Sequence, residues 1–282
     1  MIMKKIGFID FFLSEWHANN YPAWIKEICA EKGLSYEVAY AYGEKPSVFD
    51  HMTTDEWCEK FSVTKCETIE ELCEKSDCLL ILAPSNPEKH LEYAKKVFPY
   101  KKLTYIDKTF APNLPEAKEI FELSEKYGTP FFSTSALRYG DEIKDVSAKS
   151  IITTGGGSNL PEYIIHQAEM VVKTLNAAPL RVKADCQEKK YIITAEFEND
   201  KKATMVYANP LPFTVCVTKE DGSEFYSEMK SPFFKGLISD ILNFYETGER
   251  SFCPCETLKV MSLRDAALTA SEKCGEWIKC DI

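Results

Sequence analysis

The first half of the chain alternates between short apolar runs and amphipathic stretches, which is the pattern of strands and helices in turn. The apolar runs predict strands over residues 6–10, 36–42, 78–83, 103–106 and 130–133. The amphipathic stretches predict helices over residues 21–32, 68–75, 87–98 and 114–127. The run 78–83 is apolar at every position, as in a strand buried on both faces of a parallel sheet. Repeated strand–helix units therefore predict a doubly wound parallel sheet.

Local signals place several helix ends. Pro22 is expected near the first turn of helix 21–32, and Gly33 directly after its last residue,. Thr68 is the expected N-cap of the next helix, with Glu71 at the capping-box spacing,.

After about residue 140 the pattern changes to one long helix followed by closely spaced strands. We expect that helix over residues 159–176 and two more over 233–246 and 257–276. The expected strands are 151–154, 180–185, 191–197, 203–207, 213–218 and 224–226. Consecutive strands with short turns predict a mainly antiparallel sheet. The fold class is therefore α/β, with a Rossmann-like domain over residues 1–138 and an α+β domain over residues 139–282, expected to bind substrate and to form oligomers.

Composition narrows the classes of partner. The net charge of −10 disfavours a nucleic-acid partner, because a phosphate backbone would be repelled on average,. No apolar run approaches the ~20 residues that span a bilayer, so no membrane partner is expected. Asp10 interrupts the apolar stretch after Lys4 and Lys5, which argues against a signal peptide,. The eleven cysteines lack Cys-x-x-Cys spacing, so we expect reduced thiols and a cytoplasmic protein,.

The turn after the first strand lacks the glycines that a dinucleotide-binding turn uses. Where G-x-G-x-x-G would place glycine, the chain has Asp10, Phe12 and Glu15. Phe12 would obstruct the approach of a pyrophosphate, and the two carboxylates would add negative charge beside it. Each carboxylate near a phosphate could cost on the order of 1 kcal/mol even at solvent-like dielectric. This turn therefore argues against the usual cofactor geometry.

Three later segments, in their order and spacing, resemble the Gfo/Idh/MocA family, the glucose-fructose oxidoreductase and inositol dehydrogenase group. A buried strand runs into Pro84, Asn86 and His90, where the family has A-T-P-x-x-x-H. A second strand ends in Asp107-Lys108-Thr109, where the family has Glu-Lys-Pro. A third segment exits the first half at Arg138, as the family's S-x-x-x-R does. The resemblance covers most of the chain.

The resemblance implies a nicotinamide cofactor, NAD or NADP, and a sugar or polyol substrate. The residues expected to line the cofactor site are Asp10, Phe12, Pro84, Asn86 and Asp107. Lys108 matches the family lysine that contacts substrate, where an ammonium stabilises the alkoxide that forms as hydride leaves. Its structural alternative is a surface lysine at a strand end. Thr109 replaces the family's proline, so the backbone shape that proline imposes is not expected there.

A second candidate for catalysis lies on the long helix. Glu162, His166 and Glu169 share one helical face, and carboxylates could orient the histidine to accept a substrate proton,. An inert core histidine explains the pattern equally well. Without a fourth ligand we expect no metal site there. Arg138, Glu162 and Glu169 are expected to contact substrate, and the glycines at 155–157 to form a flexible loop rather than a phosphate cradle.

These observations leave three hypotheses open. The first is an NAD(P)-dependent oxidoreductase acting on a sugar, polyol or related hydroxyl substrate. The second is a family member that has lost dinucleotide binding and acts as a non-catalytic ligand-binding or assembly protein. The third is a non-redox enzyme, such as a lyase or hydrolase, that uses the same cleft. Fold cannot separate them, because function belongs to the site. By resemblance, we also expect a homodimer or higher homo-oligomer.

Overall fold

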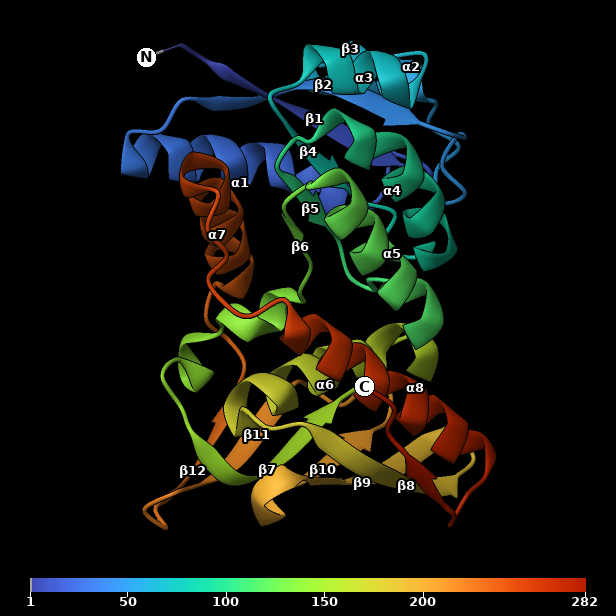
Figure 1. Ribbon diagram of the computed structural model, residues 1–282, viewed down its shortest axis with the longest axis vertical. Helices are drawn as coiled ribbons and strands as arrows, with labels where there is room; N and C mark the ends of the chain where they lie inside the picture. The colour runs from blue at the N-terminus through green and yellow to red at the C-terminus, as the bar shows by residue number, and fades with distance from the viewer. Residues whose placement is uncertain (1) are drawn as a thin grey trace. The chain divides into compact units, whose positions relative to one another are not determined.

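The computed structural model describes residues 2–282, which divide into two compact units (Figure 1). Unit 1 contains the chain up to Thr134 together with Leu237–Phe252. Unit 2 contains Ser135–Gly236 and Cys253–Ile282. In the part of the chain that the structure describes, no helix is both long and apolar enough to cross a membrane.

Unit 1 is built on a six-stranded parallel sheet in the order β3-β2-β1-β4-β5-β6. Its strands are β1 (Lys4–Asp10), β2 (Tyr36–Gly43), β3 (Thr64–Lys65), β4 (Cys78–Ile81), β5 (Thr104–Ile106) and β6 (Phe131–Phe132). All four residues of β4 are buried, as its apolar run predicted. The strand order reverses between β1 and β4, and ligands of such sheets bind outside the carboxyl ends of the strands at this point. The predicted doubly wound parallel sheet is confirmed.

Helices cover both faces of this sheet. They are α1 (Trp16–Lys32), α2 (Thr54–Phe61), α3 (Ile69–Lys75), α4 (His90–Val97) and α5 (Leu114–Tyr127), with short 3₁₀ turns at η1 (Pro87–Lys89) and η2 (Phe98–Tyr100). In Figure 1, α4 and α5 lie on one face, while α1 lies on the other beside α7 (Phe233–Thr247). The pattern did not predict α2, although Thr53 and Glu56 give it a complete capping box,.

Most of α7 packs in unit 1, although the sequence assigned it to the second domain. Tyr245 donates a hydrogen bond to the carbonyl of Leu79 at 2.7 Å, inside the parallel sheet. Lys4 and Tyr36 both bond Glu246, at 2.8 and 2.6 Å. These contacts join residues more than 160 positions apart, so no local pattern in the sequence could predict them.

Unit 2 contains a seven-stranded sheet in the order β12-β11-β7-β10-β9-β8-β13. The strands are β7 (Ala148–Gly155), β8 (Pro179–Gln187), β9 (Lys190–Phe197), β10 (Lys202–Tyr207), β11 (Thr214–Lys219), β12 (Glu224–Glu228) and β13 (Trp277–Lys279). Only β7 and β10 pair in parallel, so the predicted mainly antiparallel sheet is confirmed. Helices α6 (Leu160–Leu175) and α8 (Cys255–Glu272) pack on one of its faces. Short 3₁₀ turns are η3 (Ala136–Tyr139), η4 (Asp141–Ile143) and η5 (Glu198–Asp200).

The glycine run after β7 is closely packed. A side chain added at Gly155 would meet the ring of Phe213, and one at Gly157 would meet the ring of Tyr163. At Gly156 it would collide with the carbonyl of Ala208. Close packing therefore leaves no room for a side chain at these three positions, and the flexibility of the loop stays a prediction.

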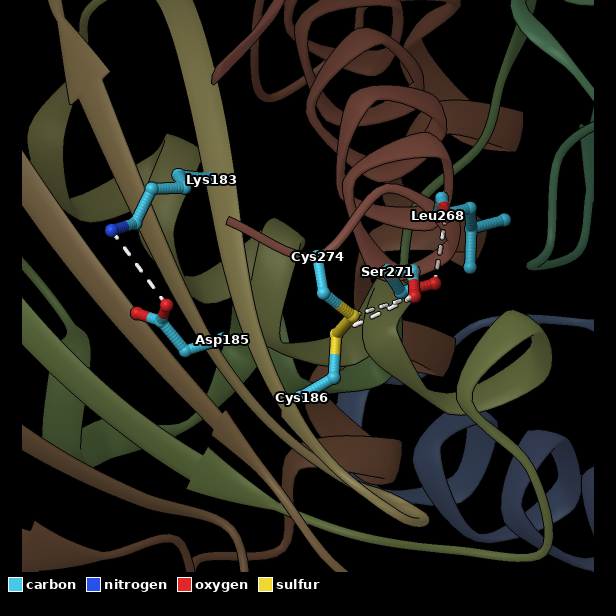
Figure 2. Close-up of a disulfide and its surroundings, with 6 residues drawn as sticks. All are labelled: Lys183, Asp185, Cys186, Leu268, Ser271 and Cys274. Atoms are coloured by element: carbon cyan, nitrogen blue, oxygen red, sulfur yellow. Dashed lines mark hydrogen bonds and ion pairs between the residues drawn. A yellow bond between two sulfur atoms is a disulfide. The ribbon is translucent and has the colours of Figure 1, made fainter. Parts of the chain in front are cut away.

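A disulfide in unit 2 joins Cys186 of β8 to Cys274, which follows α8 (Figure 2). The two Cα atoms are 5.8 Å apart, and both sulfurs lie within 3.4 Å of the Ser271 carbonyl oxygen. Cys253 and Cys255 form a second disulfide. The prediction of reduced thiols is therefore wrong for these four cysteines, because the fold brings distant or neighbouring sulfurs together without any recognisable spacing. The cytoplasmic location stays a prediction.

The Cys186–Cys274 bond closes a loop across 88 residues, which restricts the unfolded chain. In the chain-entropy model, replacing Cys274 by serine should therefore lower the free energy of unfolding by about 4 kcal/mol. Urea unfolding with and without reductant measures the loss. Cys216→Ser, at a free exposed cysteine of the same unit, is the control. Equal stability of Cys274→Ser and the parent protein would contradict the prediction.

Candidate functional site

A buried polar cluster lies at the carboxyl edge of the parallel sheet in unit 1. Asp10 ends β1, and Asp107 with Lys108 follows β5. Glu15 and His17 come from the start of α1. All five side chains are at least nine-tenths buried. Three acidic and two basic groups are thus collected at the edge where ligands of this sheet type bind.

Asp10 connects the two strands at the switch point. Its Oδ1 accepts a hydrogen bond from the Ala83 backbone at 3.1 Å, just beyond β4. Ala83 has a φ of 54°, in the left-handed region that an alanine rarely adopts,. Asp10 Oδ2 is fully buried and has no hydrogen-bond partner within residues 2–282. Burial, together with the charge of Glu15, raises the pKa of Asp10 well above its ordinary value,.

Asp107 forms a short ion pair with His17. Its Oδ2 contacts His17 Nδ1, and its Oδ1 accepts the Lys108 backbone N–H at 2.8 Å and the Tyr105 hydroxyl at 3.2 Å. Burial alone would raise the pKa of Asp107, but the charge and hydrogen bond of His17 outweigh it and lower that pKa,. The imidazole also stacks on Tyr21, with ring centres 5.2 Å apart. The sequence suggested stacking or sugar contacts for His17, but it did not indicate the pair with Asp107, which lies 90 residues away.

Lys108 is 9% exposed, yet its ammonium has no hydrogen-bond or ion-pair partner in the part of the chain that the structure describes. A buried cation without a partner is unfavourable unless a ligand or water contacts it. Lys108 is thus packed at the strand end with a free ammonium, and its catalytic role stays a prediction. The peptide bond from Lys108 to Thr109 is cis.

Glu15 occupies the N-terminus of α1. As the N-cap residue it accepts hydrogen bonds from the backbone N–H groups of His17, at 2.9 Å, and Ala18. Burial raises the pKa of Glu15, although His17 and these two hydrogen bonds oppose the shift. Because this cap starts the helix at Trp16, Pro22 lies inside α1 and not near its first turn as predicted. The expected αL cap at Gly33 is confirmed, with φ 67°.

The remaining predicted cofactor residues lie around this cluster. Phe12 is 5% exposed and packs edge-on against Phe49, with ring centres 5.6 Å apart. Pro84 is buried at the end of β4, and Asn86 donates a hydrogen bond to Glu88 at 2.9 Å. The structure thus brings Asp10, Pro84 and Asp107 to one edge of the sheet, while Phe12 belongs to the packed core of the turn.

A dinucleotide with its pyrophosphate on α1 does not fit these residues. The N–H groups of the first turn that would bind phosphate already bind the Glu15 carboxylate,. Two further phosphate charges would lie beside the carboxyl groups of Glu15 and Asp107. At the end of β2, where an acid usually holds the ribose, Glu44 is bonded to Lys89 at 2.9 Å and to Tyr93 at 2.8 Å,.

His90, from the A-T-P-x-x-x-H-like segment, has a structural role. It is fully buried, and its two ring nitrogens face the carbonyls of Phe110 and Leu82 at 2.9 and 2.5 Å. Burial lowers the pKa of His90. This histidine joins the start of α4 to the segments that follow β4 and β5, which supports the edge where the polar cluster lies.

In unit 2, two predicted substrate residues pair with each other. Arg138 donates to Glu169 at 2.9 Å and also contacts Glu256 of α8. Lys173 donates to the Arg138 carbonyl, and burial, with the nearby Arg138 charge, lowers the pKa of Lys173 to about 8. Arg138 and Glu169 thus form a buried ion pair. The sequence did not indicate the contact of Arg138 with Glu256, because Glu256 lies 118 residues further on.

His166 is bonded to the Ser135 hydroxyl at 2.7 Å through Nδ1, and its ring contacts Tyr163 and Phe213 edge-on. Glu162 is bonded to Asn159, the N-cap of α6, at 3.2 Å. Among residues 2–282 there is no group of three His, Cys, Asp or Glu side chains that could hold a metal ion.

Comparison with known proteins gives a likeness at the level of structure. No family model matches the sequence, and no curated protein does. Among solved structures, myo-inositol dehydrogenase from Lactobacillus casei, in complex with NAD(H) and myo-inositol, is similar with a TM-score of 0.81 at 12% identity, over 100% of this chain and 98% of that chain. UDP-N-acetylglucosamine 3-dehydrogenase GnnA from Acidithiobacillus ferrooxidans has a TM-score of 0.77 at 12% identity, over 97% and 99%. The dehydrogenase MviM from Clostridium difficile has a TM-score of 0.72 at 16% identity, over 95% and 99%. The chain has the fold of the Gfo/Idh/MocA-type dehydrogenases, as its motifs predicted.

The raised pKa of Asp10 predicts a pH dependence of stability. The folded protein keeps this proton above about pH 4, where an unfolded aspartate ionises, so the contribution of Asp10 to stability decreases as pH rises,. Asp10→Asn removes that dependence, so its stability relative to the parent protein should increase as the pH rises above about 4. Urea unfolding at several pH values measures the difference. Glu122→Gln, on the exposed surface of α5, is the control. A stability difference between Asp10→Asn and the parent protein that does not grow with pH would contradict the prediction.

Proposed function

We propose that this chain is an oxidoreductase of the Gfo/Idh/MocA type that acts on a hydroxyl group of a sugar, a polyol or a related small molecule. The observation that carries the proposal is the largely buried Lys108, whose ammonium has no hydrogen-bond or ion-pair partner among the described residues and follows Asp107 of the Asp107–His17 pair at the carboxyl edge of the parallel sheet. Support also comes from the similarity in fold, over nearly the full chain, to dehydrogenases of myo-inositol and UDP-N-acetylglucosamine.

In this proposal the residues of unit 1 bind and polarise the substrate oxygen. The Lys108 ammonium donates a hydrogen bond to that oxygen and stabilises the negative charge that develops on it. Asp107 accepts a hydrogen bond from the Lys108 backbone N–H and so orients Lys108. Asp107 also accepts a hydrogen bond from the proton-bearing Nδ1 of His17, so Nε2 is the ring nitrogen that exchanges a proton with the substrate,. The roles of His166, Arg138, Glu162 and Glu169 in substrate binding stay predictions.

One observation favours a second candidate function. The resemblance implies NAD or NADP, yet the Glu15 carboxylate occupies the helix terminus that a pyrophosphate would need. A protein of this fold that no longer binds a dinucleotide would act as a ligand-binding or assembly protein. Titration with NAD, NADH, NADP and NADPH, followed by thermal shift, separates the two. A ligand at a hundred times its Kd stabilises by about 2.7 kcal/mol, and no shift at millimolar concentration would favour the second function.

Lys108→Met tests the proposed role of the ammonium. With any sugar or polyol that the protein oxidises, this variant should lower kcat/KM by about 10²-fold or more, because the developing alkoxide loses its positive partner. Lys95→Met, which removes a surface ion pair to Glu119, should leave turnover unchanged. Steady-state kinetics with each nucleotide measures both variants. Unchanged kcat/KM in Lys108→Met would contradict the assignment of Lys108.

We also propose that the protein forms homo-oligomers through the face of the unit 2 sheet that α6 and α8 do not cover. Ile152, Ile192 and Tyr226 lie on that face by their strand register and are 48%, 44% and 67% exposed. Burying such apolar side chains between two copies would stabilise the assembly. Light scattering should give a dimer or larger species for the parent protein and a smaller one for Ile152→Glu/Ile192→Glu. A monomeric parent protein would overturn this proposal.

A further inference from the structure

The first turn of α1 presents two backbone N–H groups that are both bonded to one carboxylate of the same chain. The N-terminus of a helix has unsatisfied N–H groups and a partial positive charge, so it binds anions. In doubly wound sheets the turn after the first strand offers this terminus to a pyrophosphate. Here the anion is the side chain of Glu15, on the N–H groups of His17 and Ala18.

The turn that carries Glu15 is held by its own contacts. The Glu15 N–H donates to the Leu13 carbonyl at 2.8 Å, and the Ser14 hydroxyl donates to Asp50 at 2.7 Å. Ser47 donates to the Ser14 carbonyl at 2.8 Å. Phe12 and Leu13 are both buried. The carboxylate is therefore fixed over the helix terminus by a packed turn and is only 7% exposed.

We infer that Glu15 is a built-in anion of helix α1 that competes with the pyrophosphate of a dinucleotide for the same backbone N–H groups. The inference rests on the proposed function, because competition by Glu15 would lower the affinity of the proposed oxidoreductase for its dinucleotide cofactor. Two arguments support competition. Both oxygens of the Glu15 carboxylate accept hydrogen bonds from the backbone N–H groups of the first turn of α1. Asp10 and Asp107 also lie beside this carboxylate. A dinucleotide can therefore bind these N–H groups with its pyrophosphate only when the Glu15 carboxylate no longer accepts hydrogen bonds from them.

The experiment compares dinucleotide affinity in variants of Glu15. Glu15→Ala and Glu15→Gly remove the competing carboxylate, while Glu15→Gln keeps an oxygen that can cap the helix but removes the charge. Binding of NADH and NADPH, followed by the fluorescence of the nicotinamide, should be at least tenfold tighter in Glu15→Ala and Glu15→Gly than in the parent protein. The affinity of Glu15→Gln should lie between that of the parent protein and that of Glu15→Ala. Circular dichroism of each variant confirms that it is folded.

Thr68→Ala is the matched control. Thr68 caps α3 through a hydrogen bond from the Glu71 N–H at 3.1 Å, after a strand two positions from β1 in the sheet. This variant loses a helix cap as Glu15→Ala does, and its affinity for NADH should equal that of the parent protein. A gain in Thr68→Ala as large as that in Glu15→Ala would overturn the inference, since the effect would then follow from a loosened helix alone.

The outcomes separate this inference from the proposed function. Tighter binding in the Glu15 variants supports the inference whether or not the parent protein binds. If the parent does not bind, that result favours the second function, in which Glu15 has ended dinucleotide use. Binding of NADH by the parent protein with no gain in any Glu15 variant overturns the inference and leaves the oxidoreductase proposal standing. No binding in the parent or any variant overturns both.

Discussion

The hydrogen bonds from the first turn of α1 to the Glu15 carboxylate determine the geometry of the buried cluster. They fix the start of the helix at Trp16, which places His17 in the first turn and its ring next to Asp107. Asp107 in turn accepts the backbone N–H of Lys108. A single local cap thus positions three residues from two distant parts of the chain, and a shift of the helix start by one residue would move His17 by about 100° around the helix axis.

The cluster is stable as a set of charges because its members compensate one another. Burial and the charge of Glu15 raise the pKa of Asp10, while the neighbouring His17 lowers the pKa of Asp107, so the two aspartates are driven in opposite directions. Removing one member would leave another buried charge without a partner, which costs more than an exposed ion pair contributes.

Sequence patterns predicted those elements whose ends are encoded locally. The helix Leu114–Tyr127 has its residues as predicted, because Asn113 caps its start and Gly128 adopts the left-handed conformation at its end. The start of α1 was misplaced because a glutamate is not a usual N-cap, and β13 was missed because it is three residues long,. In the candidate site, the residues at the strand ends were identified from their order. The partners of those residues were not, because the pairings of His17 with Asp107 and of Arg138 with Glu256 join positions 90 and 118 residues apart.

The route of the chain through unit 1 has a consequence for how the protein is made. The chain leaves unit 1 after Thr134, returns at Leu237 and leaves again after Phe252. Until that returning segment has been synthesised, the Leu79 carbonyl lacks Tyr245, and Phe132 lacks the ring of Phe244. The apolar surface of the nascent parallel sheet therefore stays incomplete while residues 135–236, about a hundred residues, emerge from the ribosome. Nearly the whole chain must be translated before its N-terminal half can finish folding.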